Sequence, residues 1–344
     1  MKSYTINDTA GGKTTVVRGS RVRVGTPLFR GRREGEKAGK SKKHTRAFFR
    51  DLKKSKRAGL GASQGTVVCF HKTEIGFSHL RECKVCQDYS DARIEKGRYI
   101  VTACDGHGGK IYLRSDRGSK FASEAAMQAL LKAEPKADGT LGEEQCNRLR
   151  LEILCNWNAR VEKDLADHPL TMEEVGFLSE ENRFRLQGDP ALAYGSTMHA
   201  VMLCGNAVVY AGIGDGGSFL LRDGKMISLE EDDESVANVT QSLCQEDAYE
   251  HLHVGVVSGV GDAGIVVCTD GTINPYRDLT NFRQAFADPL FAKLSQGKTQ
   301  EVEEFMVSLG RKVGIGDDVS VGAILREGTK GKTKKRSKRR GKRV

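Results

Sequence analysis

The sequence of 344 residues has no apolar run that approaches the length of a membrane-spanning helix, about 18 to 20 residues. Its first residues, MKSYTINDTAGGKTTVVRG, also lack the apolar centre of a secretory signal peptide. We therefore expect neither a transmembrane protein nor a protein exported by such a signal. Because 38% of the residues are hydrophobic, enough for a substantial core, we expect a globular protein that is intracellular and cytoplasmic.

Regularly spaced cysteine pairs are missing as well. The nine cysteines are an odd number, they are scattered, and several lie within apolar runs such as GIVVC and HAVMLC. This pattern is typical of small buried side chains in a reducing compartment and not of a disulfide framework. Cys83 and Cys86 form one CxxC pair with His79 upstream, but the second Cys/His pair of a zinc finger is absent nearby, so zinc is the weaker interpretation.

Acidic residues are absent from residues 329–344, which contain ten Lys and Arg. Residues 1–60 contain 18 Lys and Arg but 4 Asp and Glu, so 27 of the 55 basic residues and 41 of the 45 acidic residues remain for the centre, 61–328. We therefore expect an acidic central domain over 61–328 between two basic arms that are disordered by themselves. The arms suit nucleic acid, an acidic protein, an anionic membrane or, in a eukaryotic host, an import receptor that would carry the protein into the nucleus. An equally simple interpretation is that they aid solubility.

The chain also lacks room for helices between its central strands. β-Branched residues and turn signals predict strands over 65–71, 97–104, 196–204, 207–213, 217–222, 264–269 and 318–325. Helical spacing predicts helices over 118–133, 142–166, 279–294 and 299–313. Only GN and GDGG separate the three strands between 196 and 222, which favours an antiparallel meander. The predicted fold class is therefore an α+β sandwich of antiparallel strands and paired long helices.

Aspartates stand beside glycines where several of these strands begin or end. They are Asp105 in TACDGHGG, Asp215 in GIGDGGS, Asp270 in CTDGT, and Asp317 with Asp318 in GIGDDVSVG, while Asp88 lies in VCQDYSD. Each one alone is typical of a turn. As a group at the ends of apolar strands, they would repel one another unless a cation lies between them. Carboxylate, carbonyl and water oxygens suit Mg²⁺ or Mn²⁺, so the sequence predicts a site for these ions.

Taken in order, the motifs QD, DGHGG, GST, GDGGSFLLRDGK, CTDG and GDDVSV resemble the metal-dependent Ser/Thr protein phosphatases of type 2C, the PPM-type phosphatases. The resemblance covers roughly residues 65–326. The opening GFSHLRECKVCQD is similar to a variant branch in which SH and CQD stand where other members have an arginine and NED. The resemblance implies two packed antiparallel β-sheets flanked by helix pairs, in agreement with the α+β pattern.

The resemblance also implies the site residues. The metal ligands that it implies are Asp88, Asp105, the backbone carbonyl of Gly106, Asp270 and Asp317, with Asp215 and Asp270 at a third, looser ion. Asp318 stands where relatives often have Asn. Two Mn²⁺ or Mg²⁺ ions would lower the pKa of a bridging water, and the resulting hydroxide would attack phosphorus in line.

His107, two residues after Asp105, is by the same resemblance the acid that protonates the leaving Ser or Thr oxygen. The alternative is a turn histidine that only holds its loop. We interpret His79 as a core histidine, and Ser196 and Thr197 as hydrogen-bonding supports of the site.

One position departs from the family pattern. Many relatives have an arginine that binds the substrate phosphate where this chain has Cys83, and a thiol cannot form the bidentate contact of a guanidinium. Lys84 or Arg81 could replace it, or the metal ions could suffice. The departure concerns affinity and rate more than reaction type.

The predicted function is thus a protein serine/threonine phosphatase, a hydrolase of phosphoproteins. The alternative is a pseudophosphatase scaffold that binds acidic proteins or nucleic acid through its basic arms. The filled metal positions favour the enzyme. A nucleic-acid-binding protein without this fold is disfavoured, because the centre is acidic and has no interleaved aromatic and basic residues.

Overall fold

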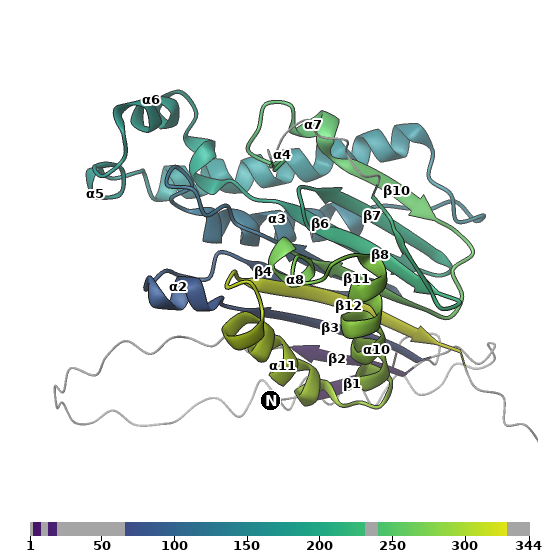
Figure 1. The fold of residues 1–344 in the computed structure, drawn as a ribbon. Coiled ribbons are helices and arrows are strands. Elements are labelled where there is room, and N and C mark those ends of the chain that lie inside the picture. Colours follow the sequence, from purple (N-terminus) through teal and green to yellow (C-terminus); the bar gives the residue numbers. More distant parts are fainter. Residues whose placement is uncertain (1–2, 8–12, 19–65, 231–239, 329–344) are drawn as a thin grey trace, which may run out of the picture.

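The structure is a computed structural model that describes residues 3–7, 13–18, 66–230 and 240–328. Two β-sheets pack face to face within these residues (Figure 1). The larger sheet has the strand order β1-β2-β3-β12-β11-β8-β9, and the smaller has the order β10-β7-β6-β5-β4. Neighbouring strands are antiparallel except β2 and β3, which are parallel.

The strands have the following bounds: β1 (Ser3–Asn7), β2 (Lys13–Arg18), β3 (Thr66–Glu74), β4 (Tyr89–Glu95), β5 (Arg98–Cys104), β6 (Met198–Cys204), β7 (Ala207–Ile213), β8 (Gly217–Arg222), β9 (Lys225–Ser228), β10 (His253–Val257), β11 (Ala263–Cys268) and β12 (Val319–Glu327). The helical elements are α2 (Phe77–Arg81), α3 (Ser115–Leu130), α4 (Glu143–Asp167), α5 (Met172–Val175), α6 (Glu180–Gly188), η1 (Pro190–Tyr194), α7 (Ala248–His251), α8 (Asp270–Ile273), α9 (Leu279–Phe282), η2 (Arg283–Ala287), α10 (Asp288–Ser295), α11 (Thr299–Ser308) and η3 (Leu309–Val313).

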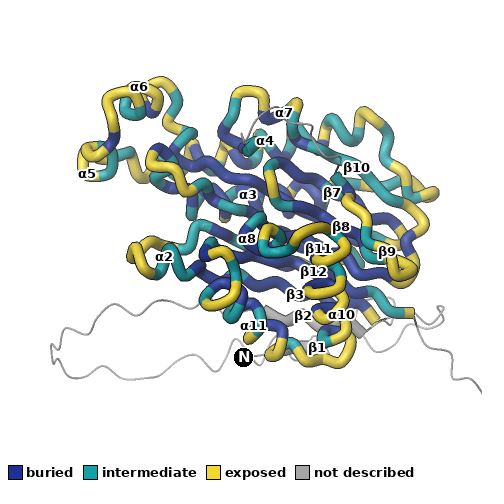
Figure 2. The backbone as a smooth tube through the Cα atoms, in the orientation of Figure 1, coloured by how far each residue is buried: buried dark blue, intermediate teal, exposed yellow. Residues whose placement is uncertain are grey.

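Helices cover both outer faces of the sandwich. In Figure 1, α3 and α4 lie over the smaller sheet, and α10 and α11 lie over the larger one. The buried residues of α4 are Leu149, Ile153, Trp157 and Val161, so the apolar spacing of this helix forms one core-facing stripe, as the sequence predicts. A separate apolar cluster fills the space between the sheets, whose central strands are largely buried (Figure 2), with Val101, Val201 and Val267 among its fully buried members. The architecture is therefore the predicted α+β sandwich.

Each strand and long helix that the sequence predicts is present, although the predicted helix 279–294 is divided into α9, η2 and α10, and the predicted helix 299–313 into α11 and η3. The predicted meander over 196–222 is wrong in its third strand. β7 pairs with β6 and β10, whereas β8 pairs with β11 and β9 in the other sheet. The chain crosses between the sheets at the GDGG turn, where Gly214 has a φ of 104°, a conformation that favours glycine. The crossing places Asp215 where the two sheets meet.

The two arms fall largely outside the described residues. The tail at 329–344 lies outside them entirely, as does most of 1–60. Within 1–60, where the sequence predicts no regular structure, β1 and β2 extend the larger sheet beside β3. The helices of the described part of the chain include none with the length and apolar character needed to cross a membrane.

Candidate metal centre

Five predicted aspartates come together at one edge of the sandwich. Asp88 directly precedes β4 and Asp105 directly follows β5, both strands of the smaller sheet. Asp215, Asp270 and Asp317 lie at the ends of β8, β11 and β12, which belong to the larger sheet. The packing of the two sheets therefore joins carboxylates that the sequence spreads over more than two hundred positions.

The carboxylates are in close contact. Oxygen atoms of Asp105, Asp215 and Asp270 all lie within 4.8 Å of one another, a spacing that could hold one metal ion. The side chain of Asp105 also interacts electrostatically with that of Asp88. Asp317 interacts electrostatically with Asp105 and Asp270. The five side chains thus form one acidic cluster.

The protonation behaviour of this cluster follows from burial and like charge. Burial, followed by the charge of Asp105, raises the pKa of Asp88 well above its ordinary value. Burial and then the charge of Asp270 raise the pKa of Asp105 in the same way. Burial and the charge of Asp215 raise the pKa of Asp270 to about 6, and burial raises that of Asp317. A divalent cation among these oxygens would reduce both the desolvation cost and the repulsion, so the donor set fits Mn²⁺ or Mg²⁺.

Neutral side chains orient the carboxylates. The Thr269 hydroxyl donates to Asp88 Oδ2 at 2.8 Å, and the Thr240 hydroxyl donates to Asp215 Oδ2 at 2.7 Å. Thr197 binds the backbone of Asp105 twice, because its Oγ1 accepts from the Asp105 N–H and its own N–H donates to the Asp105 carbonyl. The supporting role predicted for Thr197 agrees with these contacts. Sequence reasoning missed Thr269, although it directly precedes Asp270 in the CTDG motif.

Gly106 occupies a position that has no room for a side chain. A Cβ atom there would lie 2.5 Å from the Ser115 carbonyl oxygen and 2.7 Å from that of Gln87. The backbone of Gly106 also pairs with Ser196 in an isolated antiparallel bridge. The glycine after Asp105 is therefore required for the close approach of three chain segments, and its backbone lies directly beside the carboxylate cluster.

His107 is held at both of its backbone polar groups. Its N–H donates to the Gly195 carbonyl at 3.1 Å, and its carbonyl accepts from Nε2 of Gln87 at 3.2 Å. The imidazole lies against Tyr112, with 4.8 Å between ring centroids. Burial lowers the pKa of His107, and the nearby charge of Asp215 opposes this shift. The loop thus fixes the imidazole close to the acidic cluster.

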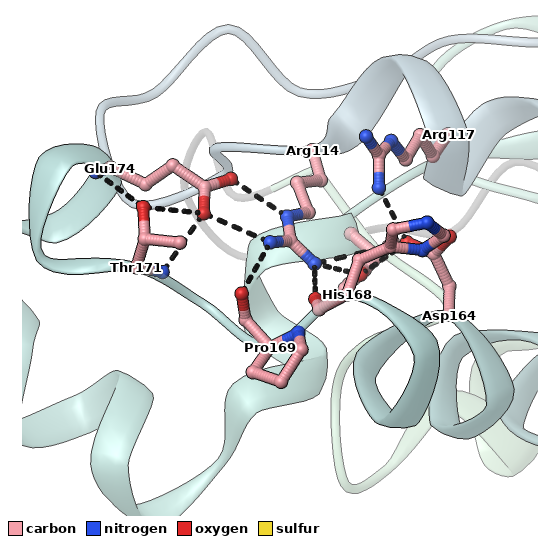
Figure 3. Close-up of polar contacts among 8 residues, drawn as sticks. Arg114, Arg117, Asp164, His168, Pro169, Thr171 and Glu174 are labelled. Carbon is pink, nitrogen blue, oxygen red and sulfur yellow. Dashed lines mark hydrogen bonds and ion pairs between the residues drawn. The ribbon is translucent and has the colours of Figure 1, made fainter.

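A buried arginine anchors the end of the DGHGG loop (Figure 3). Arg114 donates through Nε and Nη2 to the two carboxylate oxygens of Glu174, both at 2.9 Å. It also donates to the carbonyls of His168 and Pro169 and to the Tyr194 hydroxyl. The ion pair connects α5 to the start of α3, and no local pattern in the sequence predicted it.

The residues of the SH and CQD segment have separate positions. His79 Nδ1 lies 3.0 Å from Oδ1 of the buried Asp318, and this contact raises the pKa of His79. Cys83 is exposed at the end of α2 in the left-handed region, with a φ of 56°. The Lys84 amine pairs with Glu82 at 2.6 Å.

Within the described residues no contact joins Lys84 or Arg81 to the carboxylates, so a substrate role for either stays a prediction. Likewise, the one candidate metal cluster among these residues consists of aspartates and includes neither Cys83 nor Cys86.

Comparisons with known proteins identify the class to which this fold and site belong. The sequence model of the protein phosphatase 2C family matches residues 75–306. The chain therefore belongs to the protein phosphatase 2C family, and it is a metal-dependent protein serine/threonine phosphatase. A search of curated protein sequences found no match.

Solved structures with a similar fold include PppA, a key regulatory component of T6SS in Pseudomonas aeruginosa, with 18% identity, 77% of this chain and 99% of that chain covered, and a TM-score of 0.51. They also include the serine/threonine phosphatase of S. agalactiae, with 20% identity, coverage of 76% and 100%, and a TM-score of 0.46. The catalytic domain of PstP in complex with two manganese ions has 14% identity, coverage of 76% and 98%, and a TM-score of 0.44. The likeness to PppA shows the shared fold.

Proposed function

We propose that this phosphatase hydrolyses phosphoserine and phosphothreonine at a centre of two Mn²⁺ or Mg²⁺ ions built from the five clustered carboxylates. The observation that supports this proposal is the meeting of carboxylates from both sheets beside His107, with pKa values raised by burial and mutual repulsion. A pseudophosphatase scaffold would not need this arrangement, because an acidic cluster of this kind destabilises the fold unless a cation is bound.

The ligands in this proposal are Asp88, Asp105, the Gly106 carbonyl, Asp270 and Asp317, with Asp215 and Asp270 at a third ion. When bound, the ions supply an activated water and positive charge for the phosphoryl oxygens. Asp88 is fully enclosed and oriented by a hydroxyl donor, whereas Asp215 is exposed, which suits a tighter and a looser site respectively.

His107 is the proposed acid. Its fixed backbone and its contact with Tyr112 hold the imidazole beside the cluster, where it can donate a proton to the leaving Ser or Thr oxygen. The pKa lowered by burial makes the imidazolium a stronger acid than an exposed histidine. Hydrolysis of a substrate whose leaving group departs without a proton should therefore depend less on His107.

The direct test is hydrolysis of a phosphothreonine peptide by the full chain with Mn²⁺, with EDTA, and with an Asp270→Asn variant. We expect turnover that requires Mn²⁺ and that falls at least about 100-fold in the variant, the scale of losing a principal catalytic interaction. Asp262→Asn, an exposed aspartate at the opposite end of β11, is the matched control and should retain activity. A folded wild-type protein with no turnover at any Mn²⁺ or Mg²⁺ concentration would contradict the proposal.

We also propose that the protein is cytoplasmic and that the basic arms at 1–60 and 329–344 direct it to anionic partners, either nucleic acid or acidic proteins. Their charge supports this proposal, since ten basic residues without acids attract anions at low ionic strength. The test compares binding of the full chain and of a chain ending at residue 328 to a DNA duplex at 50 and 200 mM salt. Equal binding by both chains would exclude a role for the tail.

A further inference from the structure

Asp318 is a buried carboxylate that the proposed metal chemistry does not use. It is 2% exposed. Its Oδ1 accepts from the Gly76 N–H at 2.7 Å and lies 3.0 Å from His79 Nδ1, while its Oδ2 accepts from the Gln87 N–H at 2.7 Å. One side chain therefore joins the start of α2, the segment before β4 and the start of β12.

Gln87 extends these contacts to the loop that carries His107. Its Nε2 donates to the His107 carbonyl at 3.2 Å and to the Ser115 hydroxyl at 2.6 Å. Its backbone carbonyl accepts from the Ser119 hydroxyl at 2.5 Å. Because Gln87 directly precedes Asp88, its backbone determines where this proposed ligand lies. Its side chain also determines where the loop that carries His107 lies.

Asp318 also lies beside a second proposed ligand, Asp317. It directly follows Asp317, and its N–H donates to Oδ1 of Asp317 at 2.9 Å. A displacement of Asp318 would therefore move Asp317 through the chain and Asp88 through Gln87. These two ligands come from different sheets, so a shared hydrogen-bonding partner can fix the spacing between them.

His79 supplies the side-chain partner that this carboxylate needs. A buried carboxylate is costly when its oxygens lack partners, and His79 is the one basic side chain paired with Asp318 among the described residues. The Ser78 N–H donates to the Gly316 carbonyl at 3.0 Å, which fixes α2 against the same loop. The His79 side chain is itself largely enclosed, with 12% exposed.

We propose that His79, Asp318 and Gln87 form a positioning relay that sets the distance between the metal ligands and the acid His107. This inference rests on the proposed function and deepens it. The relay has two sets of contacts. The His79 contacts lead through Asp318 to Asp317 and Asp88, and the Gln87 contact leads to the His107 carbonyl. It gives the histidine and glutamine of the SH and QD motifs a shared physical role.

The His79 contacts of the relay are tested with His79→Ala and His79→Asn in the full chain. Asparagine can place an amide N–H near the position of Nδ1, so it preserves the contact with Asp318. We expect His79→Ala to weaken Mn²⁺ binding about tenfold by calorimetry, and to lower kcat for p-nitrophenyl phosphate with less than about a twofold change in KM. His79→Asn should return Mn²⁺ affinity to within about threefold of wild type.

The matched control is Arg311→Gln. Arg311 Nε donates at 2.7 Å to Glu74, a carboxylate of the same 2% exposure on a neighbouring strand, but this pair contacts no proposed ligand. The control should lower the melting temperature and leave Mn²⁺ affinity unchanged. Equal losses of Mn²⁺ affinity in Arg311→Gln and His79→Ala would overturn the relay, because general destabilisation would then explain both.

The Gln87 contact of the relay is tested with Gln87→Met. This change keeps the backbone N–H that donates to Asp318 and removes the side-chain amide that donates to the His107 carbonyl. We expect kcat for a phosphoserine peptide to fall about tenfold with Mn²⁺ affinity within about twofold of wild type. This variant also serves if His79→Ala does not fold.

The possible failures are distinguishable. Wild-type protein that binds no Mn²⁺ contradicts the proposed function. Wild-type binding together with unchanged Mn²⁺ affinity in folded His79→Ala, or with unchanged kcat in Gln87→Met, contradicts the relay alone.

Discussion

The hydroxyl of Thr269 donates a 2.8 Å hydrogen bond to Oδ2 of Asp88, a residue 181 positions earlier in the chain. Thr269 follows β11 in the larger sheet and Asp88 precedes β4 in the smaller one. The Thr269 oxygen also accepts from the Ser320 N–H at 3.0 Å. This threonine thus connects the two sheets at the proposed metal centre, and its removal should affect metal binding more than it affects the core.

Thr269→Val removes the donor to Asp88 while it keeps the shape of the side chain. We expect Mn²⁺ affinity to fall about 10- to 100-fold, the usual cost of losing a residue that orients a ligand. Calorimetric titration with Mn²⁺ measures the change. Thr269→Ser keeps the hydroxyl and is the control; an affinity loss in Thr269→Ser as large as that in Thr269→Val would show that the hydrogen bond is not the cause.

Asp105→Asn should have opposite effects on the metal-free and metal-bound protein. The repulsion and burial that raise the pKa of Asp105 destabilise the ionised form, so the neutral amide should raise the melting temperature in EDTA, on the order of 2–4 °C per kcal/mol gained. The same change should abolish the stabilisation that Mn²⁺ gives to wild type. Differential scanning calorimetry in EDTA and in Mn²⁺ measures both, and a lower melting temperature in EDTA would contradict the account of the cluster.

His107→Gln separates proton donation from the rest of the chemistry. A serine oxygen is a poor leaving group and needs a proton, whereas p-nitrophenolate does not. We expect kcat for a phosphoserine peptide to fall about 100-fold or more, and kcat for p-nitrophenyl phosphate to fall less than about tenfold. Steady-state kinetics on both substrates test this, and equal losses on the two would assign His107 a structural role in its loop.

Glu174→Gln should alter the acid stability of the protein. The hydrogen bond from Arg114 lowers the pKa of Glu174 from 4.5 to about 2. Its ion pair therefore contributes stability that is fully present above pH 4.5 and is lost as the pH falls toward 2. The variant should melt at a lower temperature than wild type at pH 7, with a difference that shrinks between pH 4.5 and 2. A difference that stays constant over this range would exclude the ion pair as its source.

Local patterns in the sequence were sufficient for most elements of the fold. Apolar residues every four positions predicted the buried face of α4, and β-branched runs between turns predicted the strands of both sheets. The same patterns failed at β8, since GDGG signals a change of direction but not the sheet to which the next strand belongs. β4, β9 and β10 were also missed, because they are short or partly exposed and their apolar pattern is weak.

The motifs also contain the aspartates that the structure brings together, because an aspartate at the end of an apolar strand is a local feature. The sequence by itself determined the core stripe, most of the strands, and the residue types at the proposed metal centre. The tertiary structure decided their partners: Thr269 for Asp88, His79 for Asp318, and Glu174 for Arg114. These contacts join segments from different strands and helices. The contact of Thr269 with Asp88 depends on the packing of one sheet against the other, and the other two depend on how strands and helices far apart in the sequence come to lie side by side. Sequence spacing specifies neither.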